Sequence, residues 1–118
     1  MNFTLGKDEK LKSRKLIERL FSEGKSISKF PVKLYYLPIE DVEKNQAAFA
    51  VPKKNFKSAV TRNRLKRQLR EVYRHHKHLL SPENGKKFAL LFLYIGKDKP
   101  QFAQLDSSIT ALLKHSIT

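Results

Sequence analysis

The sequence has no cysteine, no tryptophan and one methionine among its 118 residues. The lack of cysteine excludes disulfide bonds and thiolate zinc sites, and it fits a reducing compartment. Long apolar runs are also missing, because the longest, FALLFLYI at 88–95, is far shorter than the roughly 20 residues of a membrane-spanning helix. The first ten residues, MNFTLGKDEK, lack the apolar stretch of a secretory signal. We therefore expect a cytoplasmic protein.

Acidic residues are also few. Eleven Asp and Glu stand against 25 Lys and Arg, which gives a formal net charge of +14. Such a charge repels itself unless a polyanion is close, so nucleic acid is the expected partner and an anionic membrane surface is the competing one. The length and the 40% of hydrophobic residues predict one folded domain over 1–118, with 1–12 as an extended arm.

The helical spacing of apolar residues predicts three helices. The first is expected at about 14–23, with Ser13 as its N-cap and Gly24 directly after its end. The second is the basic segment 59–78, which a turn at 81–87 follows. The third is marked by Phe102, Leu105, Ile109, Leu112 and Leu113.

Three segments have the pattern of strands. The alternating run 30–38 and the run 47–51 are joined by a short charged turn, so we expect them to pair antiparallel as a hairpin. The run 88–95 is apolar on both faces, as in a buried central strand. An extra short strand at 25–28 stays open. The strand, helix, strand order around 59–78 predicts a crossover between strands that are neighbours or nearly so.

The basic segment holds most of the charge. From Lys53 to Lys77 there are ten basic residues and one acid, Glu71, which is +9 of the total +14. On a helical projection, one side should pack on a sheet and consists of Leu65, Leu69, Val72, Tyr73, His76 and Leu80. The opposite and flanking side consists of Asn63, Lys66, Arg67, Arg70, Arg74 and Lys77. Arg62 projects near the apolar side at the first turn, where it could border a groove between helix and sheet.

The like charges along this helix favour a polyphosphate partner. Lys66, Arg70 and Arg74 follow one another in one row, and each pair costs a few tenths of a kcal/mol unless an anion lies between them. Arginine outnumbers lysine on the helix, and its guanidinium fork matches phosphate oxygens in pairs. The plain alternative is a solvated basic surface with no specific ligand.

The segment KKNFKSAVTRNRLKRQLREVY resembles the RNR signature of the protein component of bacterial ribonuclease P. The lysine pair, the short loop, Ala-Val, Arg-Asn-Arg, the hydrophobic residue, Lys-Arg and the further Arg are all present. RLFSEGKSI at 19–27 resembles the end of the family's first helix. The resemblance covers nearly the whole chain and implies an α+β fold, a two-layer α/β sandwich with an about four-stranded mixed sheet packed by helices (ribosomal protein S5 domain 2-like). It also implies a left-handed β-α-β crossover, where the general rule favours the right hand.

In this family the catalyst is a large RNA that removes the 5′ leader of precursor tRNA with Mg²⁺, and the protein assists. The resemblance therefore implies a subunit of an endoribonuclease that has no catalytic or metal-binding residues of its own and binds no cofactor alone. Its implied partners are the catalytic RNA and precursor tRNA, with no membrane, and the protein itself is expected to be a monomer.

The resemblance also implies the site residues. The RNA contacts are expected at Lys53, Lys54, Lys57, Arg62, Asn63, Arg64, Lys66, Arg67, Arg70 and Arg74. A cleft between the basic helix and the sheet should hold the single-stranded leader, and it is expected to be lined by Phe21, Lys33 and Tyr35. Phe21 could equally pack in the core. The chain departs from the family at Ile17, where Phe is frequent, and at Leu93 and Tyr94, where Ala-Arg is frequent.

Other classes stay open on the residues alone. A ribosomal or general RNA-binding protein would have a similar charge, whereas membrane binding is weak because the core needs the apolar face of the basic helix. The acids are scattered, and Glu40, Asp41 and Glu43 gather only in a turn, so a protein-only metal nuclease is disfavoured. His75 and His78 share one side of a helix, but no acid or cysteine is expected nearby to complete a metal site.

Overall fold

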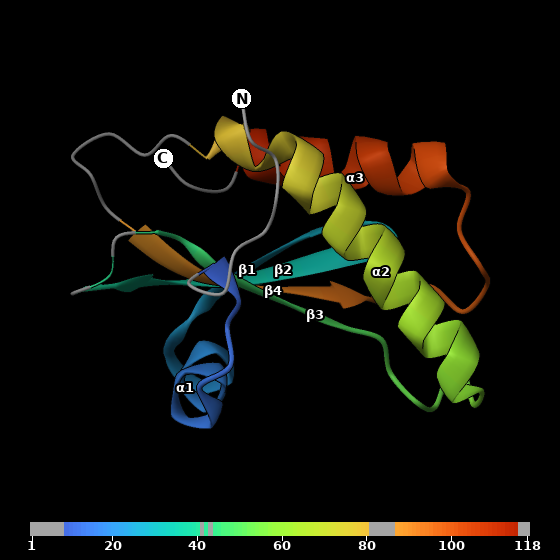
Figure 1. Cartoon of the computed structure of the whole chain (residues 1–118), viewed down its shortest axis with the longest axis horizontal. Helices are drawn as coiled ribbons and strands as arrows, with labels where there is room; N and C mark the ends of the chain where they lie inside the picture. The colour runs from blue at the N-terminus through green and yellow to red at the C-terminus, as the bar shows by residue number, and fades with distance from the viewer. Residues whose placement is uncertain (1–8, 41, 43, 81–86, 116–118) are drawn as a thin grey trace.

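The computed structural model describes residues 9–40, 42, 44–80 and 87–115, which form a four-stranded sheet with helices on both faces (Figure 1). The turn expected at 81–87, except for Lys87, lies outside the described residues, as do Asp41 and Glu43. The elements in chain order are α1 (Arg14–Glu23), β1 (Lys25–Lys29), β2 (Val32–Ile39), β3 (Gln46–Ala50), α2 (Ala59–His76), the short 3-10 helix η2 (Lys77–Leu79), β4 (Lys87–Tyr94) and α3 (Phe102–His115).

The sheet has the strand order β1-β2-β4-β3. β1 and β4 each pair antiparallel with β2, and β3 pairs parallel with β4. The predicted hairpin between 30–38 and 47–51 is therefore wrong, because β4 lies between these two strands. β4 is buried along nearly its whole length, and an all-apolar strand is stable only with neighbours on both sides.

The crossover prediction is confirmed, since β3 and β4 are parallel neighbours joined through α2. The hand of this crossover stays a prediction from the family resemblance. The short strand considered at 25–28 is also confirmed, as β1. The mixed four-stranded sheet with its three helices is the α+β fold expected from the sequence.

The first helix begins and ends where the sequence predicts. The Ser13 Oγ accepts a hydrogen bond from the Leu16 backbone N–H at 3.2 Å, and the Gly24 N–H donates to the carbonyl of Leu20 at 3.1 Å. Gly24 has an ordinary φ of −72°, so the left-handed conformation is not the reason for a glycine here. A Cβ at this position would instead overlap the backbone oxygen of Leu20 and come within 3.0 Å of the Tyr36 oxygen.

The hydrophobic core consists of two clusters, one on each face of the sheet. α2 and α3 cover one face, where Leu65, Leu69, Val72, Tyr73 and Leu80 of the predicted stripe are buried. His76 is the exception, because it is partly exposed and pairs with Asp106. α1 lies on the opposite face (Figure 1), where Leu20 packs with Leu11, Ala89 and Leu91. Burying each such side chain contributes roughly 1.5–3 kcal/mol. None of the described helices is long and apolar enough to cross a membrane.

The described part of the expected N-terminal arm lies along the edge of β3. The Leu11 N–H donates to the Ala47 carbonyl at 2.9 Å, and Lys10 forms a parallel bridge with Ala47. Glu9 is 8% exposed and accepts from the Lys77 Nζ at 2.7 Å, just beyond the end of α2. The arm is therefore tied both to the sheet and to the basic helix.

Candidate nucleic-acid interface

The loop between β3 and α2, residues 51–58, is held in place at several points. The Pro52 carbonyl accepts from the backbone N–H groups of Asn55 and Phe56, both at 3.3 Å. The Phe56 ring is buried against the Tyr94 ring, with 5.8 Å between centroids, and Asn55 Nδ2 donates to the Gly96 carbonyl at 3.4 Å. This anchored backbone carries three exposed lysines, Lys53, Lys54 and Lys57.

The start of α2 continues from this loop. The Ser58 Oγ caps the helix by accepting from the Thr61 N–H at 3.3 Å. Arg62 Nη1 donates to the carbonyls of Phe56 at 2.8 Å and Lys57 at 2.9 Å. The sequence placed Arg62 near the border of a groove, and its partly exposed side chain in fact contacts the backbone of the lysine loop.

The next turns of α2 present cations outward. Arg64, Arg67 and Arg70 are exposed and Lys66 is partly exposed, beside the exposed Asn63. None of these four cations makes an ion pair with another residue in the part of the chain that the structure describes. Together with the three loop lysines and Arg62 they form what we call the cationic face.

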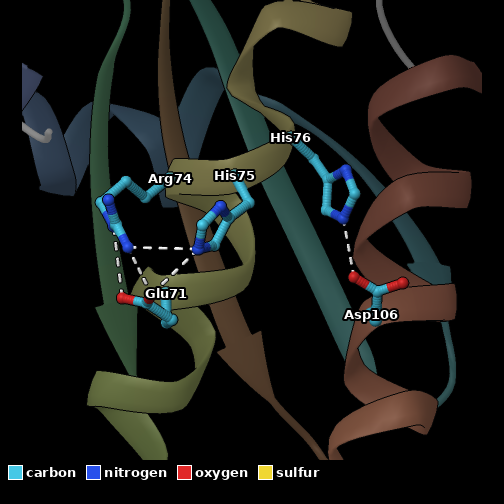
Figure 2. Close-up of polar contacts among 5 residues, drawn as sticks. All are labelled: Glu71, Arg74, His75, His76 and Asp106. Atoms are coloured by element: carbon cyan, nitrogen blue, oxygen red, sulfur yellow. Dashed lines mark hydrogen bonds and ion pairs between the residues drawn. The ribbon is translucent and has the colours of Figure 1, made fainter. Parts of the chain in front are cut away.

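The last turns of α2 are different, because their basic side chains contact acidic side chains of the protein itself (Figure 2). Arg74 donates to both oxygens of Glu71, through Nε at 3.2 Å and through Nη2. His75 Nε2 lies 3.0 Å from the Glu71 carboxylate, one helical turn before it. The hydrogen bonds from Arg74 hold the pKa of Glu71 below its usual value. The single acid of the basic segment therefore neutralises Arg74, which the sequence placed among the RNA contacts.

Two further ion pairs fix this end of the helix. His76 Nε2 lies 2.6 Å from Asp106 Oδ1 on α3, as Figure 2 shows, and Lys77 pairs with Glu9. Among the described residues there is no group of three or more His, Cys, Asp or Glu side chains that could hold a metal ion. The cationic face therefore ends at Arg70. Beyond it, Arg74 and His75 pair with Glu71 within α2, and His76 and Lys77 pair with other segments.

The residues expected to line a cleft come together on the sheet face that α1 covers in part. This face is opposite the one on which α2 packs, so the expectation of a cleft between the basic helix and the sheet was wrong. The Phe21 ring, from α1, meets the Tyr35 ring edge-on with 4.8 Å between centroids, and the Lys33 Nζ lies 5.0 Å from the Tyr35 centroid. Phe21 is 54% exposed, so the alternative that it packs in the core was wrong. Ile17 packs against the small cluster under α1, where it supports the helix. The open face thus carries two accessible aromatic rings and a cation.

A pocket of about 620 Å³ extends this face toward the lysine loop. Leu93 lines it and pairs directly with Lys33 across β2 and β4, so both side chains lie on the same face of the sheet. Tyr94 instead points into the opposite core and is 2% exposed. The cations at this pocket are Lys54 and Lys97, and Lys97, which follows soon after the end of β4, is not among the RNA contacts expected from the sequence.

The fold and this surface define a class: small α+β proteins in which a cationic loop and helix lie beside a sheet face with accessible aromatic rings at its border with a helix. A family model for ribonuclease P matches residues 5–116. The chain belongs to the family of ribonuclease P protein components.

Similar proteins agree with this assignment. The chain is 40% identical to the ribonuclease P protein component of Chlorobium phaeobacteroides, over 97% of this chain and 88% of that protein. It is 35% identical to the ribonuclease P protein component of Porphyromonas gingivalis, over 91% of this chain and 82% of that protein. Among solved structures, the RNase P protein from Thermotoga maritima has the same fold, with a TM-score of 0.75 and 24% identity over 90% of this chain and 96% of that one.

Proposed function

We propose that this protein binds the catalytic RNA of ribonuclease P and the 5′ leader of precursor tRNA, and that it assists removal of the leader. The observation that carries the proposal is the cationic face itself, whose helical cations have no acidic partner among the described residues. Charges placed together without acids are stabilised when a phosphate backbone replaces their counterions. Membership of the ribonuclease P family supports the RNA of that holoenzyme as the partner.

Within the cationic face, arginine and lysine have different tasks. The guanidinium forks of Arg64, Arg67 and Arg70 each suit two phosphate oxygens, whereas Lys66 and the loop lysines act as point charges. Asn63 lies between two arginines and both donates and accepts, so it suits a ribose hydroxyl or a base edge. The face follows one side of a helix, as a contact to a structured RNA backbone requires.

The leader is proposed to lie on the open sheet face between α1 and the lysine loop. Phe21 and Tyr35 offer ring faces and edges for stacking unpaired bases, a contact worth about 1–3 kcal/mol per base. Lys33, Lys54 and Lys97 lie along the same face and would neutralise the leader phosphates. A single strand with unstacked bases fits this combination better than a duplex does.

The chemistry of cleavage is assigned to the RNA subunit. The described residues provide no set of ligands for Mg²⁺, so the metal that the holoenzyme requires is proposed to be held by RNA. The protein then acts through binding, by holding the leader and supporting the RNA fold. We propose that it acts as a monomer in the cytoplasm.

The test is reconstitution of cleavage from purified parts. The protein is mixed with the ribonuclease P RNA and a precursor tRNA at a low Mg²⁺ concentration, at which the RNA alone is slow. We expect the protein to restore accurate cleavage at the mature 5′ end, and a basic protein that binds RNA in general should not do so. Absence of any stimulation at every protein concentration would contradict the proposal.

A further inference from the structure

Arg62 belongs to the RNR signature, yet its guanidinium is turned toward the protein's own backbone. Its Nη1 donates to the carbonyl oxygens of Phe56 at 2.8 Å and Lys57 at 2.9 Å. These two short bonds use both hydrogens of Nη1 and leave the N–H groups of Nε and Nη2. The carbonyls that Arg62 binds lie at the end of the loop that carries Lys53, Lys54 and Lys57.

Besides Arg62, the loop is held by longer hydrogen bonds and by the buried Phe56 ring. The bonds from Asn55 and Phe56 to Pro52 are 3.3 Å long and make one local turn, and the Asn55 bond to Gly96 is 3.4 Å long. The two Arg62 bonds are the shortest of those described for the loop, and they come from a charged donor. Charge-assisted hydrogen bonds are about twice as strong as neutral ones. Arg62 is therefore the main polar connection between the loop and α2.

We propose that Arg62 is a positioning residue: it fixes the loop backbone so that Lys53, Lys54 and Lys57 meet the RNA together. This inference rests on the proposed function, because it explains how Arg62 supports RNA binding without contacting the RNA. A loop that is ordered before binding loses less conformational entropy when its lysines contact phosphates. Without Arg62, each lysine keeps its charge but must be ordered during binding.

The first test needs no RNA. Hydrogen exchange of the free protein is compared for wild type, Arg62→Met and Arg70→Met, since Arg70 is an exposed arginine of the same helix without these backbone contacts. We expect the amides of Asn55 and Phe56 to exchange faster in Arg62→Met only, because the turn they close loses its connection to α2. Unchanged protection of these two amides would overturn the positioning role.

The second test is a double-mutant cycle on RNA affinity. Arg62→Met is measured in the wild-type background and in a variant with Lys53→Ala, Lys54→Ala and Lys57→Ala. We expect a loss of about tenfold in the first background and of less than about twofold in the second, because coupled residues are not additive. Arg70→Met should cost the same in both backgrounds.

The salt dependence of RNA affinity, measured for the same variants, tests the inference independently. Arg62→Met should flatten the dependence of affinity on salt in the wild-type background and leave it unchanged once the three lysines are absent. Equal losses from Arg62→Met in the two backgrounds would overturn the inference and make Arg62 a direct RNA contact. A wild-type protein that does not bind the ribonuclease P RNA would refute the proposed function alone, since hydrogen exchange would still test the positioning role.

Discussion

The boundary of the cationic face can be tested by comparing Arg70 with Arg74, which lie one turn apart on α2. Arg70 is exposed and makes no ion pair within the described chain, whereas Arg74 is bonded to Glu71 by two of its nitrogens. We predict that Arg70→Gln removes one phosphate contact. The double variant Glu71→Gln/Arg74→Gln keeps the net charge and should remove none.

The magnitude follows from counterion release. The logarithm of affinity falls linearly with the logarithm of salt concentration, and each lost phosphate contact makes this slope shallower by about 0.7–0.9. Between 50 and 200 mM salt, wild-type affinity should therefore fall by about threefold more than the affinity of Arg70→Gln. For the double variant, the fall over the same range should equal that of wild type.

The assay is a titration of the ribonuclease P RNA with each variant at four or more salt concentrations, with urea unfolding as a check that both variants are folded. Equal slopes for Arg70→Gln and wild type would refute the assignment of Arg70 to the RNA backbone. A flatter slope for the double variant would show that the interface extends past Glu71, and it would refute the boundary proposed from the ion pair.

Three further predictions follow from other contacts. Tyr35→Ala should weaken binding of precursor tRNA by about 1–3 kcal/mol and leave mature tRNA unaffected, in a binding assay with holoenzyme; equal losses for both substrates would contradict the leader site. Gly24→Ala should destabilise the fold by about 1–3 kcal/mol in urea unfolding, because the new Cβ meets the Leu20 carbonyl, whereas Ser22→Ala, on the exposed side of the same helix, should change stability little. The lowered pKa of Glu71 stabilises the fold above the carboxyl group's usual pKa of 4.5, and this stabilisation disappears as the pH falls through the lowered value. The stability difference between wild type and Glu71→Gln should therefore shrink on acidification in that range, and a difference that is constant from neutral pH to pH 3 would count against the ion pair with Arg74.

The sequence predicted elements well because their signals are local. The N-cap Ser13, the apolar spacing of α2 and the all-apolar run of β4 each depend on neighbours in the chain, and each was confirmed. The pairing of β2 with β3 failed because a short connection favours a hairpin only when no other strand competes. β4 has apolar residues on both faces, and in the structure it lies between β2 and β3 with nearly all of them buried.

The candidate site was predictable in its residue types and less so in its contacts. The charge pattern selected the cationic face, but projection on a helix cannot show that Arg62 binds the carbonyls of Phe56 and Lys57. The projection also treated Glu71 as one charge among many, although its spacing from Arg74 and His75 is the usual one for helical ion pairs. Lys97 was not among the expected contacts, and it becomes a neighbour of Lys54 only after the crossover has formed.

The two edge strands of the sheet, β1 and β3, are protected in different ways from pairing with another molecule. Lys10 and Leu11 pair with Ala47 on the outer side of β3, and the Lys77–Glu9 ion pair holds the preceding residue. On the other rim, β1 is short and has a lysine at each end, so two copies that approach along it repel each other. The lysines at one rim and the segment paired with Ala47 at the other are both features that disfavour addition of a strand from another molecule.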